Sequence, residues 1–259
     1  MPCDHDDSRG VALLAVRGVS KSFQSGRSRR QVLFDVSVDV HAGECLAVIG
    51  GSGSGKSTLT RIMLGLERAD AGSVAYDGHA VTGRDRTVQR ESGLVFQDPF
   101  SSLDPRWTVA QSVAEPLRLR GVGRDEAFRR ARHALQTVGL DADAFGRRYP
   151  VDLSGGQAQR VAIARAIVAE PRVLLADEPM SAIDVAARLQ ILDAFAAIRA
   201  ARPDVALVVV SHDLGVVRHL ADRILVLHDG SVEEVGPTAE VLCDPQSEYT
   251  RELIAAATL

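Results

Sequence analysis

The strongest constraint on the fold is a glycine-rich stretch in the first quarter of the chain. It reads Gly50-Gly51-Ser52-Gly53-Ser54-Gly55-Lys56-Ser57 and fits the pattern G-x-x-x-x-G-K-[ST]. The apolar run Cys45–Ile49 precedes it and a helical pattern over Lys56–Leu66 follows. Glycines let backbone N–H groups turn inward, and a helix start adds a positive dipole end. The order predicts a strand, a phosphate-binding loop and a helix; a flexible Gly/Ser linker is the alternative, which the full pattern disfavours.

This loop predicts a nucleotide site that includes residues 50–57 and the next residue, Thr58. The ammonium group of Lys56 can reach the β- and γ-phosphates of ATP. The hydroxyl group of Ser57 can bind Mg²⁺, whose charge offsets that of the phosphates. ATP and Mg²⁺ are therefore the expected ligands.

A second candidate half of the site is Val173-Leu174-Leu175-Ala176-Asp177-Glu178. A buried strand here would deliver two carboxylates at its C-terminal end, where open α/β sheets bind ligands. We expect Asp177 to bind Mg²⁺ through water and Glu178 to be the general base. Adjacent carboxylates can take different roles when their surroundings differ.

The remaining sequence pattern predicts an α/β fold. Short apolar runs suit central strands of a parallel sheet that is covered on both faces. They alternate with helical patterns, as in a βαβ arrangement. Besides Cys45–Ile49, the predicted strands are Val173–Ala176, Val205–Val210 and Ile224–Leu227, and the further predicted helices are Gly156–Ala169 and Ala187–Ala200.

Three stretches depart from this alternation. Residues from about Asp98 to Asp152 are rich in Arg, Ala and Leu and predict helices, for example Phe128–Val138 closed by Gly139. We interpret them as a helical subdomain inserted into the α/β core. Ser25–Arg30 is expected to be a polar, basic loop, and residues 1–10 are expected to be disordered.

Composition excludes several classes of protein. The chain of 259 residues fits one large domain, and its net charge of -4 gives no argument for nucleic-acid binding. No C-x-x-C pair occurs among its three cysteines, so no zinc site is expected. No apolar run approaches the ~20 residues that span a bilayer. A membrane role would therefore need partner subunits.

The segment Leu153-Ser154-Gly155-Gly156-Gln157, some twenty residues before Asp177, narrows the field. It places a hydroxyl group and two small residues at the start of a helix, which is a second possible anion site. This segment resembles the signature motif of the ABC ATPase family. The resemblance implies a head-to-tail dimer, in which Ser154, Gly155, Gly156 and Gln157 of one subunit close over ATP held by the loop of the other.

Four further residues match the family's motifs in order. Gln97, in Val95-Phe96-Gln97-Asp98, resembles the Q-loop glutamine, which would sense Mg²⁺ and the attacking water. Asp184, in Ser181-Ala182-Ile183-Asp184, resembles the D-loop aspartate, with Ile183 where Leu is usual. His212 resembles the switch histidine that contacts the γ-phosphate. Phe23 resembles the aromatic residue that stacks on adenine.

The resemblance extends from about Leu13 to Leu253. It implies a P-loop NTPase (RecA-like) core with an antiparallel β part and an inserted α-helical subdomain. On this basis the core comprises residues of about 11–97 and 158–240, and the helical subdomain about 98–157. Residues 241–259 would form a C-terminal helical tail.

Two segments resemble the peptide and nickel importer branch of the family. One runs from Gln97 to Arg106, and the other, Asp244 to Leu253, resembles a P-x-x-x-Y-T-x-x-L ending. The branch implies a second ATP-binding subunit, which is a paralogue or another copy, two membrane permease subunits, and indirectly a substrate-binding protein. It also implies a peripheral position on the cytoplasmic face of the membrane. The alternatives are a soluble ABC ATPase of DNA repair or translation, and another importer or exporter branch.

Overall fold

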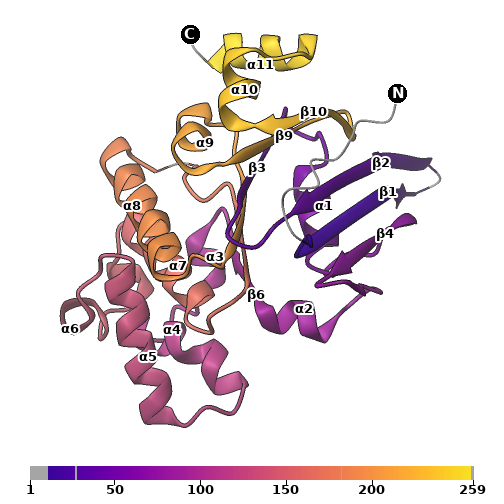
Figure 1. Ribbon diagram of the computed structural model, residues 1–259. Coiled ribbons are helices and arrows are strands. Elements are labelled where there is room, and N and C mark those ends of the chain that lie inside the picture. Colours follow the sequence, from indigo (N-terminus) through magenta and orange to yellow (C-terminus); the bar gives the residue numbers. More distant parts are fainter. Residues whose placement is uncertain (1–10, 27, 182, 258–259) are drawn as a thin grey trace.

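The computed structural model describes residues 11–26, 28–181 and 183–257, which form two sheets and a helical layer (Figure 1). The larger sheet has six strands in the order β10-β9-β3-β8-β7-β6. Its neighbouring strands from β9 to β6 are parallel, and β10 pairs with β9 in antiparallel fashion. The bounds are β3 Cys45–Ile49, β6 Ser92–Val95, β7 Val173–Asp177, β8 Ala206–Val210, β9 Arg223–His228 and β10 Ser231–Pro237.

The four apolar runs predicted as strands are confirmed. Every residue of β3 and β8 is buried, which agrees with central strands that have helices or a second sheet on both faces. Strand β6 was not predicted, because it is short and contains a glycine. A Cβ atom at Gly93 would lie 2.5 Å from the carbonyl oxygen of Ala166, so only glycine allows this close packing.

The smaller sheet is antiparallel, with four strands in the order β2-β1-β4-β5. It lies beside helix α1 (Lys56–Met63) on one side of the parallel sheet (Figure 1). The bounds are β1 Leu14–Ser25, β2 Ser28–Val40, β4 Ala71–Tyr76 and β5 His79–Ala80. The antiparallel part of the predicted fold is therefore present.

The prediction of a loop over Ser25–Arg30 is wrong. Strands β1 and β2 continue almost to their turn, and their register pairs Phe23 with Arg30 and Ser25 with Ser28. Polar residues fit these strands because Ser28, Arg29 and Arg30 are all exposed at the end of the hairpin. Alternation between buried and exposed residues marks a strand only where one face is covered.

Helices lie on both sides of the parallel sheet, and most of them lie on the side away from the smaller sheet (Figure 1). The predicted helices over Lys56–Leu66, Phe128–Val138, Gly156–Ala169 and Ala187–Ala200 correspond to α1, α5, α7 and α8, with ends that shift by a few residues. The bounds are α1 Lys56–Met63, α2 Arg86–Glu91, α3 Pro99–Ser102, α4 Val109–Leu119, α5 Arg124–Thr137, α6 Ala142–Phe145, a 3₁₀ turn at Pro150–Asp152, α7 Gly155–Ile167, α8 Val185–Ala201, α9 Leu214–Leu220, α10 Thr238–Cys243 and α11 Glu248–Ala257. None of the helices in the described ranges is both long enough and apolar enough to cross a membrane.

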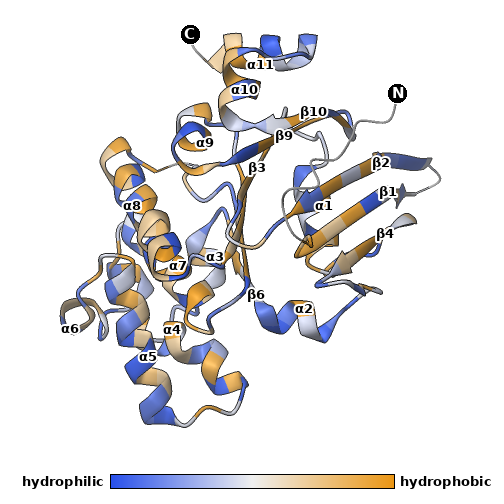
Figure 2. Ribbon diagram, in the orientation of Figure 1, coloured by the Kyte–Doolittle hydropathy of each residue, from blue (hydrophilic) through white to orange (hydrophobic). Residues whose placement is uncertain are grey.

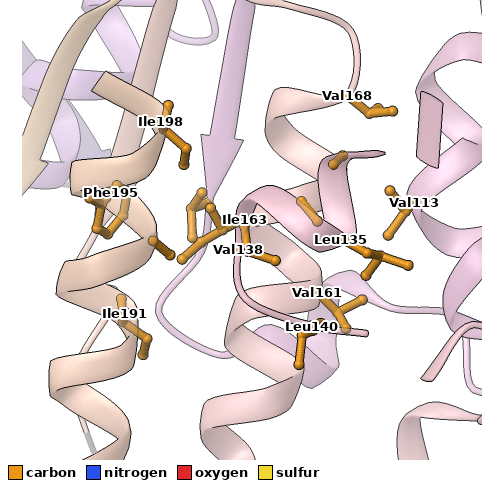
Figure 3. Packing of buried hydrophobic residues seen from close by; sticks show 14 of the residues in the cluster. Val113, Leu135, Val138, Leu140, Val161, Ile163, Val168, Ile191, Phe195 and Ile198 are labelled. Atoms are coloured by element: carbon orange, nitrogen blue, oxygen red, sulfur yellow. The ribbon is translucent and has the colours of Figure 1, made fainter. Parts of the chain in front are cut away.

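A continuous apolar cluster joins the helical layer to the parallel sheet. Figure 3 shows Leu135 of α5, and Val138 directly after this helix, facing Ile163 of α7, which in turn lies beside Phe195 of α8. Apolar residues also run along α8 and the central strands, whereas α2 is mainly hydrophilic (Figure 2). Because packing continues through α7, the division into a core and a subdomain of about 98–157 stays a prediction.

The predicted ends of the chain are only partly described. Residues 1–10, expected to be disordered, lie outside the described residues. The predicted tail of 241–259 includes the end of α10 and all of α11, and its last two residues lie outside the description. Figure 1 shows α10 and α11 beyond β9 and β10, on the far side of the molecule from α5.

Candidate functional site: a phosphate-binding cleft

The candidate site lies where parallel strands end. Gly50 follows β3, Glu178 follows β7 and His212 comes two residues after β8. Carboxyl ends of parallel strands meet at one edge of a sheet, so residues far apart in sequence converge there. They border a cleft of about 470 Å³, lined by Val32, Gly50, Gly51, Ser52, Gly53, Ser54, Gly55, Lys56, Ser57, Thr58, Glu178, His212 and Leu253.

Three glycines of the loop, Gly50, Gly53 and Gly55, have positive φ angles that favour glycine. Gly50 has a φ of 148°, and a Cβ atom there would collide with the carbonyl oxygen of Leu227. Gly53 has a φ of 78°, and a Cβ atom there would meet nothing within 4 Å. Larger residues would strain the chain at both positions. The loop therefore packs closely against β9 at Gly50, whereas the space beside Gly53 is open.

Helix α1 begins directly at this loop. Its N-cap residue is Gly55, and no side chain caps its first N–H groups. These donors and the positive end of the helix dipole are therefore available to an anion. The geometry suits the phosphate groups of a nucleotide.

Lys56 supplies a cation in the same place. Its side chain is buried, and its ammonium group donates to the carbonyl oxygens of Gly50 at 2.9 Å and Gly51 at 2.8 Å. No salt bridge joins it to a carboxylate of the described residues. Burial lowers the pKa of Lys56, because removal from water disfavours the charged form. A bound phosphate would offset that cost.

The structure brings Ser57 and Asp177 together. The hydroxyl group of Ser57 lies 3.5 Å from Oδ1 of Asp177 and donates to it. Burial raises the pKa of Asp177, since no cation neutralises its carboxylate fully. Among the described residues there is no cluster of three or more His, Cys, Asp or Glu side chains that could hold a metal. These two oxygen ligands fit Mg²⁺, which usually takes its other ligands from phosphates and water.

Glu178 lies at the meeting point of three strand ends. Oε2 of Glu178 accepts a hydrogen bond from Nε2 of Gln97 at 3.1 Å, and Nδ1 of His212 lies 3.6 Å from the same oxygen. The backbone of Glu178 has a φ of 45°, and its N–H donates to Val210 at 2.9 Å. A left-handed conformation is uncommon for glutamate and often marks functional positions. This carboxylate is therefore held by its neighbours and still faces the cleft.

The signature residues lie elsewhere on the chain. Ser154 is the N-cap of α7 and forms a capping box with Gln157. A Cβ atom at Gly156 would lie 2.5 Å from Cβ of Ala187, whereas one at Gly155 would meet nothing within 4 Å. None of Ser154, Gly155, Gly156 and Gln157 lines the cleft of its own chain.

Asp184 and Phe23 do not line the cleft either. Asp184 caps α8 by accepting from the N–H of Ala187 at 2.9 Å. Phe23 lies on the β1–β2 hairpin with 41% of its surface exposed, and the ammonium group of Lys21 is 5.1 Å from its ring centre. The predicted contact of Phe23 with adenine stays a prediction.

Three residues at the cleft were missed in the sequence. Val32 and Leu253 line it, and the hydroxyl group of Tyr249 accepts from the N–H of Gly51 at 2.9 Å. Tyr249 and Leu253 belong to the P-x-x-x-Y-T-x-x-L ending, which in the sequence indicates only the branch of the family. Its spacing of four residues, which puts both side chains on one helix face, was an available signal.

Comparisons with known proteins agree with this geometry. The sequence model of the ABC transporter family matches residues 33–181 of this chain. A protein of Brucella ovis, named as a peptide import ATP-binding protein, is 39% identical over 249 residues, which is 94% of this chain and 78% of the relative. The glutathione import ATP-binding protein GsiA of Salmonella choleraesuis is 39% identical over 259 residues, 95% of this chain and 41% of that protein.

Solved structures of ABC cassettes have the same fold. The dimeric cassette MJ0796, in a post-hydrolysis state with ADP and phosphate, is 31% identical with a TM-score of 0.76, covering 87% of this chain and 98% of that one. The protein cbiO1 of Clostridium perfringens, part of an ABC transporter complex, gives 0.80 at 26% identity, covering 90% and 91%. The family resemblance and the predicted fold class are thus confirmed. The chain belongs to the ABC transporter family, as one of its ATP-binding, ATP-hydrolysing cassettes.

Proposed function

We propose that this cassette hydrolyses Mg²⁺-ATP to drive the import of peptides through a membrane transporter. The observation that carries the proposal is the group around Oε2 of Glu178, where Gln97 and His212 converge at the lip of the Lys56 cleft. A positioned carboxylate beside a phosphate cradle is the arrangement that phosphoryl transfer to water requires. The names of the relatives supply the substrate class.

The residues of the cleft would divide the work of binding. The open N–H groups at the start of α1 and the ammonium group of Lys56 would hold the β- and γ-phosphates. Ser57 and Asp177 would hold Mg²⁺, with the side-chain oxygen of Gln97 as a further ligand. The metal supplies charge neutralisation on the phosphates.

Glu178 would act as the general base. Its carboxylate accepts a proton from water as the water oxygen attacks the γ-phosphorus, the bond to the ADP oxygen breaks, and ADP and phosphate leave. The amide of Gln97 would orient Glu178 and the water through the hydrogen bond of 3.1 Å. His212 would donate to a γ-phosphate oxygen and stabilise the charge that develops there.

The complete site would need two cassettes. Ser154 and Gly155 at the start of α7 do not line the cleft of their own chain, and a Cβ atom at Gly155 would meet nothing within 4 Å. A head-to-tail partner would bring these groups, at the N-terminus of its own α7, over the γ-phosphate. Asp184 would lie at the boundary of the two cassettes. The partner is a paralogue or a second copy.

Other subunits of the transporter would form the parts that span the membrane. No described helix can span a bilayer, so two permease subunits would form the path and a binding protein would deliver the substrate. The cassette would sit on the cytoplasmic face. Its net charge of -4 and the import relatives favour this assembly over the roles in DNA repair or translation.

The predicted branch includes importers of peptides and importers of nickel, which differ in their substrate. The names of the relatives specify peptide and glutathione import, which favours peptides over nickel chelates. The test is to purify the cassette with its permease and binding proteins and to measure ATP hydrolysis in vesicles with each substrate. Peptide should stimulate hydrolysis and a nickel chelate should not. Stimulation by nickel chelate alone would reverse the assignment, and failure to join any permease would remove the transport role.

A further inference from the structure

We propose that the C-terminal helix α11 is a positioning element of the nucleotide cleft, with Tyr249 holding the glycine-rich loop in the shape that Lys56 requires. This inference rests on the proposed function of the cleft. Its central observation is a contact across 198 positions of sequence, in which the N–H of Gly51 donates to the hydroxyl oxygen of Tyr249 at 2.9 Å.

Tyr249 and Lys56 hold opposite ends of one peptide group. The N–H of Gly51 and the carbonyl of Gly50 belong to the same planar unit, so fixing one end fixes the other. Tyr249 accepts from the N–H, and the ammonium group of Lys56 donates to the carbonyl oxygen at 2.9 Å. Glycines at both positions leave this unit with little rigidity of its own. The tyrosine hydroxyl therefore restricts a peptide group that the loop sequence alone leaves free to rotate.

Tyr249 is itself held firmly. Its ring stacks on that of His228 at 3.7 Å between ring centres. It also packs, with Leu253, against a buried apolar cluster that includes Ile49 of β3 and Val226 of β9. Ile49 directly precedes the loop, so the cluster that supports α11 includes the strand end from which the loop starts.

The start of α11 is fixed by a carboxylate of β10. Glu234 accepts hydrogen bonds from the N–H groups of Gln246 and Ser247, at 3.0 and 3.1 Å. Partial burial acts to raise the pKa of Glu234, but these N–H donors lower it overall and hold the group ionised. The register of α11 is thereby set, which places Tyr249 over Gly51.

Leu253 extends the same contact into the cleft. It follows Tyr249 by four residues, lies on the same face of α11, and lines the cleft itself. The helix thus contributes both a hydrogen-bond acceptor to the loop and part of the wall around the bound nucleotide. Any partner that moves α11 would change nucleotide affinity, and nucleotide would in turn stabilise the position of α11.

The test removes one hydroxyl group. Tyr249→Phe keeps the ring on His228 and deletes only the acceptor for Gly51. We expect the Kd for Mg²⁺-ATP to rise about three- to tenfold, the worth of one lost hydrogen bond. The KM should rise with it while kcat changes less. In the nucleotide-free protein, the amide hydrogen of Gly51 should exchange with solvent faster.

Tyr76→Phe is the matched control. It deletes a hydroxyl group that donates to Glu91 at 2.7 Å, outside the cleft. This variant should have the wild-type Kd and the wild-type exchange at Gly51, whatever its melting temperature. If Tyr249→Phe lowers the melting temperature yet keeps the wild-type Kd and exchange rate, α11 has only a structural role and the inference fails.

Binding measurements on the wild type and on Lys56→Ala distinguish failure of this inference from failure of the proposed function. Wild type should bind Mg²⁺-ATP, and Lys56→Ala should bind it much more weakly. If wild type binds no nucleotide, the proposed function is wrong and the inference falls with it. If wild type and Lys56→Ala behave as expected and Tyr249→Phe binds as tightly as wild type, only the inference about α11 is wrong.

Discussion

The side-chain amide of Gln97 donates to Oε2 of Glu178 at a distance of 3.1 Å, although 81 positions of sequence separate the two residues. Gln97 follows β6 and Glu178 follows β7, and these strands are adjacent and parallel. The contact therefore depends on the order of strands in the sheet. It gives the Glu178 carboxylate a fixed orientation and connects it to the first residues of the helical layer.

Replacing Glu178 with Gln should separate binding from hydrolysis. The amide keeps the shape of the side chain but cannot accept a proton from water, so we expect hydrolysis to slow about 10²–10⁴-fold. Affinity for Mg²⁺-ATP should stay near that of wild type. Single-turnover assays and equilibrium binding would measure the two effects.

Asp193→Asn is the control for this change, because it removes the same charge from an exposed position on α8. Its hydrolysis rate should equal that of wild type. Wild-type hydrolysis in the Glu178→Gln protein would contradict the general-base role.

Replacing Asp177 with Asn should stabilise the nucleotide-free protein in a pH-dependent way. Burial raises the pKa of Asp177, so above that pKa the folded state carries a charge that is better solvated in the unfolded chain. Below the ordinary carboxyl pKa of about 4 the group is protonated in both states and costs nothing. The melting temperature of the variant should exceed that of wild type near pH 8, and the gap should close as the pH falls through the raised pKa.

Thermal unfolding without Mg²⁺ or nucleotide, from pH 4 to 8, measures this gap. The same variant should lose Mg²⁺-dependent nucleotide binding, since it lacks the carboxylate proposed to bind Mg²⁺. A gap that does not vary with pH would show that Asp177 carries no burial cost.

Two inactive variants should restore hydrolysis when they are mixed, if the site is shared between copies of this chain. Lys56→Ala removes the loop cation, and Gly155→Arg places a large side chain where the structure shows open space. In a mixed head-to-tail dimer one site carries both defects and the other carries none. With random pairing, half of the dimers are mixed and one of their two sites is intact, giving about a quarter of wild-type activity.

Each variant alone should be inactive, and both should unfold cooperatively near the wild-type temperature. Titration of one variant into the other, followed by phosphate release, measures the recovery. A mixture that stays inactive while forming dimers would mean that loop and signature act within one chain.

Alanine at Gly156 should destabilise the protein, whereas alanine at Gly155 should not. The added Cβ atom at Gly156 would lie 2.5 Å from Cβ of Ala187 and force α7 and α8 apart. Overpacking of this kind costs about 1–3 kcal/mol. At Gly155 the added atom meets nothing within 4 Å, so the change should stay within about 0.5 kcal/mol.

Chemical denaturation of both variants gives the comparison. Both substitutions gain the same helix propensity from alanine, so the difference between them isolates the contact with Ala187. Equal stabilities would mean that α7 and α8 do not pack as closely as the structure shows.

The sequence by itself determined the parts of this protein that depend on near neighbours along the chain. Five apolar residues before Gly50 and a helical pattern after it were enough for the strand, the loop and the start of α1. The position of the Asp177 and Glu178 carboxylates at the end of a strand was predictable from the apolar run that precedes them. Such patterns are readable because side-chain periodicity and glycine spacing act over a few residues.

Only the tertiary structure decided which of these parts meet. Strand order brought Gln97 and His212 to Glu178, and the packing of α11 against β3 and β9 brought Tyr249 to Gly51. Likewise, the polar residues in the exposed hairpin of β1 and β2 form strands because each of the two strands supplies hydrogen-bond partners for the other. These outcomes depend on contacts between residues far apart in sequence, whose energies no local pattern contains.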